Sequence, residues 1–130
     1  MKSPIWPLQV ALVARIKSET NYALFDNHPE QAKFPYIVSG EVQAQDWSDK
    51  SKPGQTVTAT IHFWSQYQGK KEVSQMMDRV IQAISYLWTP NLAPDFNVVE
   101  HHLDLNEIIT DVDALTFHGI LKWMYLVEEL

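Results

Sequence analysis

The fold is decided by residues 56–88, whose sequence is TVTATIHFWSQYQGKKEVSQMMDRVIQAISYLW. Apolar and polar residues alternate through 56–66, so that one face carries Val57, Ala59, Ile61 and Phe63, and the other carries the threonines and His62. A period of two residues with many β-branched side chains predicts a strand with one buried face.

After this strand the period changes to that of a helix. Gly69 and Glu72 mark the helix start, with glutamate at the third helical position, and Thr89-Pro90 stops the helix at about Trp88. One face of this helix is apolar and carries Val73, Met76, Met77, Val80, Ile81, Ile84, Leu87 and Trp88. A helix with this pattern is typical of one that packs on a sheet.

The rest of the chain adds one helix and three strands. Residues 7–18 are predicted to be helical because Leu8, Leu12 and Ile16 recur at helical spacing, and because Pro7 suits a first helical position. Strands are predicted at 35–44, 96–109 and 116–127, and residues 111–115 join the last two as a hairpin loop. In the strand at 35–44, one face carries Tyr36, Val38, Gly40, Val42 and Ala44.

The last predicted strand is apolar on both faces. One face carries Phe117, Gly119, Leu121, Trp123, Tyr125 and Val127, and the other carries Ile120, Met124 and Leu126. A solvated face needs no second apolar set, so we expect burial on both sides, by the chain itself or by a neighbour.

These elements follow the order helix, strand, strand, helix, strand, strand (αββαββ). The order predicts an α+β, two-layer sandwich: a mainly antiparallel four-stranded sheet with two helices packed on one face. With 130 residues, the chain is expected to form a single domain over 1–130. The connection at 19–34 contains Tyr22, Leu24 and Phe25, which we expect to pack on the body of the domain.

The composition of the chain argues against several classes of function. A formal net charge of -6 argues against a protein whose main task is to grip nucleic acid. Without cysteine, the chain has no disulfide framework, zinc-thiolate site or cysteine nucleophile. No apolar run reaches the roughly 20 residues that span a bilayer, so we expect a soluble protein with no membrane partner.

Candidate catalytic and metal-binding residues are dispersed along the sequence. His101 and His102 are adjacent and point to opposite faces of a strand, while His62 and His118 each stand alone on a strand. An acidic cluster lacks the glycine and the terminal glutamate of a calcium loop; it comprises Asp104, Glu107, Asp111 and Asp113. We interpret these four as turn-forming and solubilising residues. We find no nucleophile elbow and no phosphate-binding glycine loop. We therefore predict no enzyme activity, no cofactor and no metal site.

The five tryptophans favour a binding function. We expect Trp88 and Trp123 in the core, whereas Trp6, Trp47 and Trp64 are harder to bury from the pattern. Trp47 lies in a polar loop, where it is either a contact anchor or a plug over the core. Exposed aromatic residues are favoured at protein interfaces.

Three segments stand in order along the chain: Pro35-Tyr36-Ile37-Val38; Ile61-His62-Phe63-Trp64-Ser65, with Gly69 and the amphipathic helix; and Asp111-Val112-Asp113 with Thr116-Phe117-His118-Gly119-Ile120-Leu121, ending in Leu126-Val127-Glu128-Glu129. This ordered set resembles the phage tail-completion, or tail-to-head joining, proteins of long-tailed phages and prophages. Each segment alone is mostly a strand pattern, and their order over nearly the whole chain carries the resemblance.

The resemblance implies a structural role in virion assembly. Members of this family are expected to assemble in the host cytoplasm and to cap the head-proximal end of the tail tube as a six-membered ring in the neck. The implied partners are the tail-tube protein, the head connector or stopper protein, and further copies of the chain. DNA is expected to pass through the lumen without specific binding, and an acidic lumen would ease its passage.

Loops on a rigid scaffold supply docking surfaces. We predict a partner interface at Tyr22, Phe25, Asp46, Trp47, Asp49, Lys50, Lys52, Asp111 and Asp113. Another neck or tail-terminator component would use the same kind of surface. A small-molecule-binding regulatory domain would instead show a concave polar pocket, and an enzyme would show converging titratable groups in one cleft.

Overall fold

The computed structural model describes residues 1–48, 51–85 and 87–130. Within them, the elements are α1 (Ile5–Glu19), β1 (Ala23–Phe25), β2 (Tyr36–Asp46), β3 (Gly54–Ser65), α2 (Lys71–Ile84), β4 (Phe96–Thr110) and β5 (Phe117–Glu129). The strands form one sheet in the order β1-β2-β3-β5-β4. The predicted α+β class is confirmed, but the sheet is five-stranded and mixed rather than four-stranded and antiparallel.

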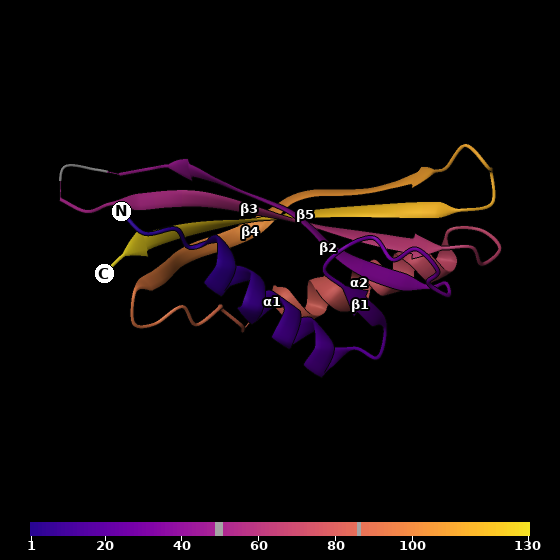
Figure 1. Ribbon diagram of the computed structural model, residues 1–130, viewed down its shortest axis with the longest axis horizontal. Coiled ribbons are helices and arrows are strands. Elements are labelled where there is room, and N and C mark those ends of the chain that lie inside the picture. Colours follow the sequence, from indigo (N-terminus) through magenta and orange to yellow (C-terminus); the bar gives the residue numbers. More distant parts are fainter. Residues whose placement is uncertain (49–50, 86) are drawn as a thin grey trace.

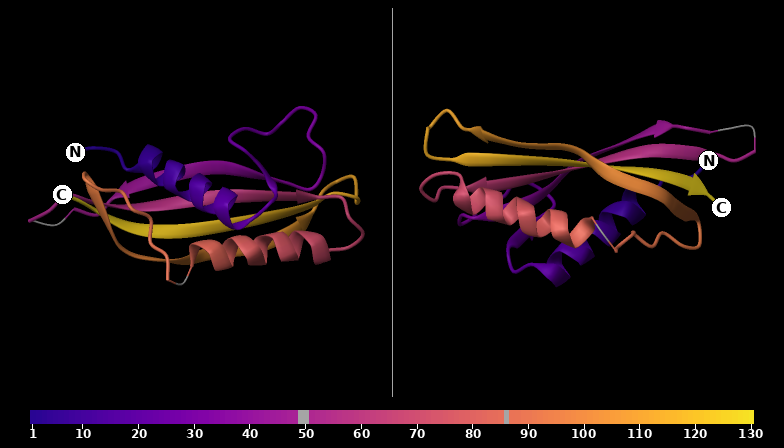
Figure 2. Two further views of the ribbon diagram at one scale, coloured as in Figure 1. Left: turned by 90° about the horizontal axis from the view of Figure 1, so that it is seen from below. Right: turned by 180° about the vertical axis from the view of Figure 1, so that it is seen from behind.

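Both helices lie on one face of the sheet (Figures 1 and 2). α1 contacts β2 and lies on that side of the molecule, whereas α2 packs against β3 and β5. The β2–β3 hairpin extends beyond the helices at one end of the sheet, and the β4–β5 hairpin extends at the other (Figure 1). Both chain termini lie at the end that carries the β2–β3 hairpin. No helix among the described residues is both long enough and apolar enough to cross a membrane.

β1 is the element that the sequence prediction lacked. Its residues pair in parallel with the start of β2, with Ala23 opposite Tyr36 and Phe25 opposite Val38. Three residues are too few to show the alternation by which strands are predicted. The expectation that this connection packs on the body is confirmed, because Leu24 lies against the core.

A β-bulge in β2 exchanges the faces of the strand. Gly40 and Glu41 both lie opposite a single residue of β3. Ile37 therefore faces the core before the bulge, and Val42 faces it afterwards. The predicted face, which ran unbroken through 36–44 and excluded Ile37, is wrong because one extra residue moves all later side chains to the opposite face.

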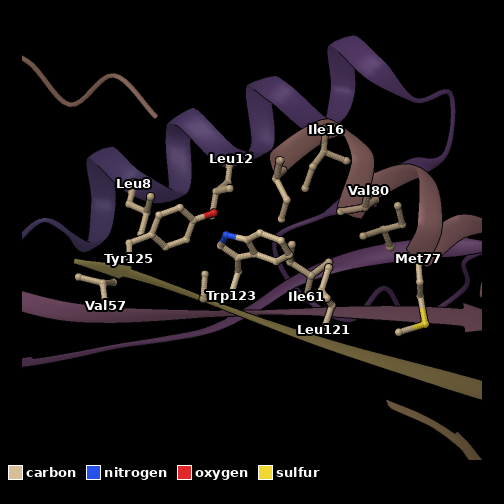
Figure 3. Packing of buried hydrophobic residues seen from close by; sticks show 14 of the residues in the cluster. Leu8, Leu12, Ile16, Val57, Ile61, Met77, Val80, Leu121, Trp123 and Tyr125 are labelled. Atoms are coloured by element: carbon tan, nitrogen blue, oxygen red, sulfur yellow. The ribbon is translucent and has the colours of Figure 1, made fainter. Parts of the chain in front are cut away.

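The core lies between the helices and the sheet (Figure 3). Trp123 and Tyr125 of β5 lie beneath α1, and Trp123 is buried as predicted. Gly119 lies under α2, where an added Cβ would come within 2.5 Å of the Met77 sulfur. The missing side chain at Gly119 thus lets α2 approach β5 closely.

Both helices differ from their predicted limits. α1 begins at Ile5 rather than at Pro7, and α2 ends at Ile84, well before Trp88. Leu87 has a left-handed φ of 63° and a fully exposed side chain, so its predicted place on the core face is wrong. Trp88 is half-buried at the margin of the core, with the Arg15 guanidinium 5.4 Å from its ring centroid.

The second apolar face of β5 is covered by no helix. Ile120, Met124 and Leu126 lie on the face opposite the helices and are half-buried among side chains of the neighbouring strands. Within one chain, the predicted burial of this second face is therefore partial, and burial by a neighbour stays a prediction.

Candidate functional site

The predicted interface residues divide between the two ends of the sheet. The β2–β3 hairpin carries Asp46, Trp47 and Lys52, while the β4–β5 hairpin at the opposite end carries Asp111 and Asp113 (Figure 1). The structure thus creates two separate candidate surfaces rather than one site.

Trp47 is held in place with 50% of its surface exposed. Its backbone N–H donates to the Gly54 carbonyl at 2.6 Å, and its ring lies so close to Gly54 that an added Cβ would approach Cε3 to 2.9 Å. The adjoining turn is fixed by the Ser48 hydroxyl, which donates to Asp46 Oδ1 at 2.6 Å. Trp47 belongs neither to the core cluster nor to the partly buried residues that pack against it, and its ring lies on the buried Gly54.

An ion pair joins the C-terminal end of β5 to this hairpin, and a hydrogen bond joins the two chain ends to each other. Lys52 Nζ lies 3.6 Å from Glu128 Oε2, and the Lys2 backbone N–H donates to Glu129 Oε1 at 2.8 Å. Lys2 Nζ donates to Asp95 Oδ1 at 2.9 Å, and this hydrogen bond raises the pKa of Lys2. Such exposed pairs stabilise the fold little, but they link the hairpin and both chain ends at the same end of the sheet.

One carboxylate orders the β4–β5 hairpin. Asp113 Oδ1 accepts the N–H groups of Leu115 at 2.9 Å and Thr116 at 2.8 Å, and Oδ2 accepts the Thr116 hydroxyl at 2.7 Å. The hydroxyl bond, together with the two amide bonds, lowers the pKa of Asp113. Ala114 between them has a left-handed φ of 58°, which is uncommon for a residue other than glycine. The turn-forming interpretation of Asp113 is confirmed.

Val112 and Leu115 project from the same hairpin. Val112 is fully exposed and Leu115 is 66% exposed. Neither residue is in the predicted interface, because only the charged residues of this turn were predicted to make contacts. The sequence did contain a signal for them, because two apolar residues stand in a short acidic turn whose side chains cannot reach the core. Apolar side chains on an ordered turn are typical of contact surfaces.

The other predicted interface residues take different places. Tyr22 is half-buried against the core, and Phe25 packs edge-to-face on Tyr36 with centroids 6.1 Å apart. Both support the β1 edge of the sheet and lie at neither hairpin tip. Asp49 and Lys50 lie outside the described residues.

A histidine pair, which the sequence analysis did not predict, lies on the face opposite the helices. His62 Nδ1 lies 2.7 Å from His118 Nε2, and His62 Nε2 lies 2.9 Å from Glu41 Oε1. With neutral rings, His118 donates to His62, and His62 donates to Glu41. Each histidine is alone on its own strand, as predicted, and the pairing of β3 with β5 brings the two side chains together.

This histidine pair borders an open hollow of about 410 Å³ that Asp26 and His28 also line. The hydrogen bond from His62 lowers the pKa of Glu41, and burial lowers the pKa of His118. Among the described residues, no group of three or more histidines and carboxylates is arranged to hold a metal ion. The cluster is therefore a hydrogen-bonded part of the sheet face.

A model of the family described as tail completion protein gp17 matches residues 10–128. The chain belongs to the tail completion protein gp17 family. The tail completion protein gp17 of Bacillus phage SPP1 is 31% identical to it over 95 residues, which are 73% of this chain and 69% of the relative.

Two solved structures share the fold of this tail completion protein. A chain in the virion of a native gene transfer agent particle has a TM-score of 0.79 at 18% identity, covering 93% of this chain and 94% of that one. The bacteriophage SPP1 gp17 protein has a TM-score of 0.59 at 23% identity, covering 96% and 95%. At these identities the two likenesses establish the fold alone.

The family match confirms the resemblance drawn from the three ordered segments, since it runs through all of them. As a tail completion protein, the chain has a structural role in the phage tail or neck.

Proposed function

We propose that this tail completion protein forms a six-membered ring on the head-proximal end of the tail tube and joins the tube to the head connector or stopper protein. The observation that carries this proposal is the placement of two ordered hairpins at opposite ends of one sheet (Figure 1). A joining protein needs two contact surfaces that face in opposite directions, and this sheet holds two at a fixed separation.

Each hairpin supplies an anchor of its own. Trp47, on the same hairpin as Lys52, anchors one end, and Asp49 and Lys50 follow it closely in the sequence. Val112 and Leu115, flanked by acidic side chains, anchor the other end. Because both turns are hydrogen-bonded within the free subunit, docking orders fewer groups and loses less conformational entropy. Their different chemistry suits two different partners. In this proposal Tyr22 and Phe25 contribute to the interface indirectly, because they stabilise the β1 edge of the sheet.

DNA passes through the proposed ring without specific binding. The formal net charge of -6 supports this part of the proposal, because like charges repel and prevent DNA from sticking to the wall. In this function the protein assembles in the host cytoplasm and ends in the neck of the virion.

The test is electron microscopy of a lysate from a phage or prophage that lacks the gene. The proposal expects DNA-filled heads beside separate tails of finished length, and joining is restored when the purified protein is added. Normal virions would overturn the assembly role. Tails of irregular length would instead support the tail-terminator alternative.

Variants at each end sharpen this test. Trp47→Asp and the double variant Val112→Asp/Leu115→Asp should each block joining. Each variant keeps one intact hairpin, so the two variants should stay bound to different halves of the particle. Gln75→Asp on the exposed face of α2 is the matched control and should join normally. If both end variants join heads to tails as well as the control does, the two-ended contact is wrong.

A further inference from the structure

Among the described residues, no helix covers the broad face of the sheet opposite α1 and α2, which we call the bare face (Figure 2). The strand register shows which side chains lie on it, because Glu100 lies opposite Leu126 and Glu107 lies opposite Ile120. The connection that follows β1 borders one end of this face, at the hollow that Asp26 lines beside the histidine pair. Both Glu100 and Glu107 are exposed in the single chain.

Carboxylates outnumber cations on the bare face. Its charged residues are Glu41, Glu100, Glu107, Lys122 and Glu128. Lys122 is the one lysine or arginine in the five described strands. Glu128 forms an ion pair with Lys52 at 3.6 Å. Glu100 and Glu107 form no ion pair within the described chain, so their charges are not neutralised by a neighbour.

The helices on the other face have a different balance of charge. Their charged residues are four cations and three carboxylates, namely Arg15, Lys17, Lys71, Arg79, Glu19, Glu72 and Asp78. Lys70 adds a further cation directly before α2. Lysine and arginine side chains bind DNA phosphates, whereas carboxylates repel them. Of the two broad faces, the bare face is therefore the one that DNA can pass without being held.

The positions of the two hairpins limit which surface can face the centre of the proposed ring. The β2–β3 and β4–β5 hairpins lie at opposite ends of the sheet (Figure 1). When one hairpin contacts the tail tube and the other contacts the head, the long axis of the sheet runs along the tail axis. The β1 and β4 edges then face sideways, towards neighbouring subunits. One of the two broad faces must therefore point to the centre of the ring.

We propose that the bare face lines the lumen of the ring, so that double-stranded DNA passes along it, and that both helices face outward. This inference rests on the proposed function and deepens it, because it assigns the face that DNA meets. Glu100 and Glu107 repel the phosphates, which carry about one negative charge per 1.7 Å of duplex. The half-buried Ile120, Met124 and Leu126 also suit a lumen, because apolar side chains offer a phosphate neither charge nor hydrogen bond.

Site-directed DNA cutting tests the proposal, because the chain contains no cysteine and one thiol can be labelled selectively. Glu107→Cys places the thiol on the bare face, and the matched control Gln75→Cys places it on the exposed side of α2. Each protein is labelled with an iron chelate, its iron content is measured, and it is incorporated into particles. The iron is activated with ascorbate and peroxide while DNA ejection is triggered. Strand breaks in the released DNA should be several-fold more frequent with Glu107→Cys than with Gln75→Cys.

Head–tail joining is measured in the same particles, which separates the two proposals. If particles join and eject DNA normally, and Glu107→Cys cuts no more than Gln75→Cys, the bare face does not line the lumen while the proposed function stands. More frequent breaks with Gln75→Cys would place the helices at the lumen and overturn the inference. If the wild-type protein is absent from the neck, the proposed function itself fails.

Reversal of charge on each face gives a second measurement. Glu100→Lys/Glu107→Lys on the bare face should slow DNA ejection several-fold at low salt, because the new lysines bind passing phosphates. Added salt should restore the rate, since counterions compete for the same phosphates. The control Glu19→Lys/Asp78→Lys makes the same change of charge on the helices and should eject DNA at the wild-type rate. Circular dichroism checks that both variants are folded. Equal ejection rates for the two variants would contradict a lumen lined by the bare face.

Discussion

His118 stacks face to face on Trp64, with ring centroids 3.8 Å apart and ring planes inclined by 9°. Burial lowers the pKa of His118, and the neighbouring His62 lowers it further. Asp111 and Glu41 act in the opposite direction, and His28 adds a smaller lowering effect. The sheet face therefore favours the neutral imidazole.

We expect the free energy of unfolding to fall as the pH decreases below the ordinary histidine pKa of about 6.5. The unfolded chain binds the proton near the ordinary histidine pKa of about 6.5, whereas folded His118 binds it at a lower pH. This contribution to stability is complete above the unfolded pKa and is lost as the pH falls through the interval between the two values. His118→Phe keeps a ring on Trp64 and removes the titration. Denaturation at several pH values should then give a shallower slope than wild type, and equal slopes would contradict the assignment.

The histidine pair shows which part of the structure the sequence could not predict. The faces of β3 follow from a local period of two, so His62 was correctly placed opposite the core. Its contact with His118 depends on the register between β3 and β5. The alternation of residues within either strand carries no information about this register. Gly40 is a similar case, because nothing in the alternation of β2 reveals the bulge that exchanges its faces.

The candidate surfaces were predictable to a similar extent. Asp113 was correctly identified as a turn residue because carboxylates accept backbone N–H groups in turns. Trp47 stood out as an aromatic residue in a polar loop, and the structure leaves it half exposed. Their placement at opposite ends of the molecule required the sheet topology. Leu87 was misplaced because α2 ends at Ile84 and because Leu87 itself has a left-handed φ, and no periodicity indicates either feature.

Substitution of Gly119 tests the close approach of α2 to β5. We expect Gly119→Ala to lower the free energy of unfolding by about 1–3 kcal/mol, because the new methyl group overpacks against Met77 and Val73. Chemical denaturation measures the loss. In the double variant Gly119→Ala/Met77→Ala the two costs should be less than additive, since the smaller side chain makes room for the methyl group. Strict additivity would show that the two residues do not share this space.

The hydroxyl of Tyr125 is a buried polar group without a hydrogen-bond partner among the described residues. Burial also raises the pKa of Tyr125 well above its ordinary range. We expect Tyr125→Phe to raise the free energy of unfolding by about 1 kcal/mol, because it removes an unsatisfied polar group from the core. Tyr36→Phe is the matched control, since the Tyr36 hydroxyl has His28 Nε2 at 3.4 Å and its loss should bring no gain. A less stable Tyr125→Phe protein would mean that this hydroxyl is hydrogen-bonded in solution.

Loss of the Asp113 carboxylate should loosen the β4–β5 hairpin and leave the rest of the sheet folded. Asp113→Ala removes the acceptor of two amide N–H groups and one hydroxyl. Hydrogen exchange of residues 111–116 should become faster, while exchange in β3 stays unchanged. Since the pKa of Asp113 is lowered, its contribution to stability is present above the unfolded value of about 3.9 and is lost as the pH falls through the folded value.

The same variant tests whether order at this hairpin matters for joining. Val112 and Leu115 are fixed in space only while the turn holds, so Asp113→Ala should reduce head–tail joining several-fold although both apolar side chains remain. Ala114→Gly is the matched control, because glycine adopts the left-handed φ of 58° without strain and leaves the Asp113 bonds intact. The control should join normally. If Asp113→Ala speeds exchange at 111–116 and joins as well as Ala114→Gly, an ordered hairpin is not required for contact at this end.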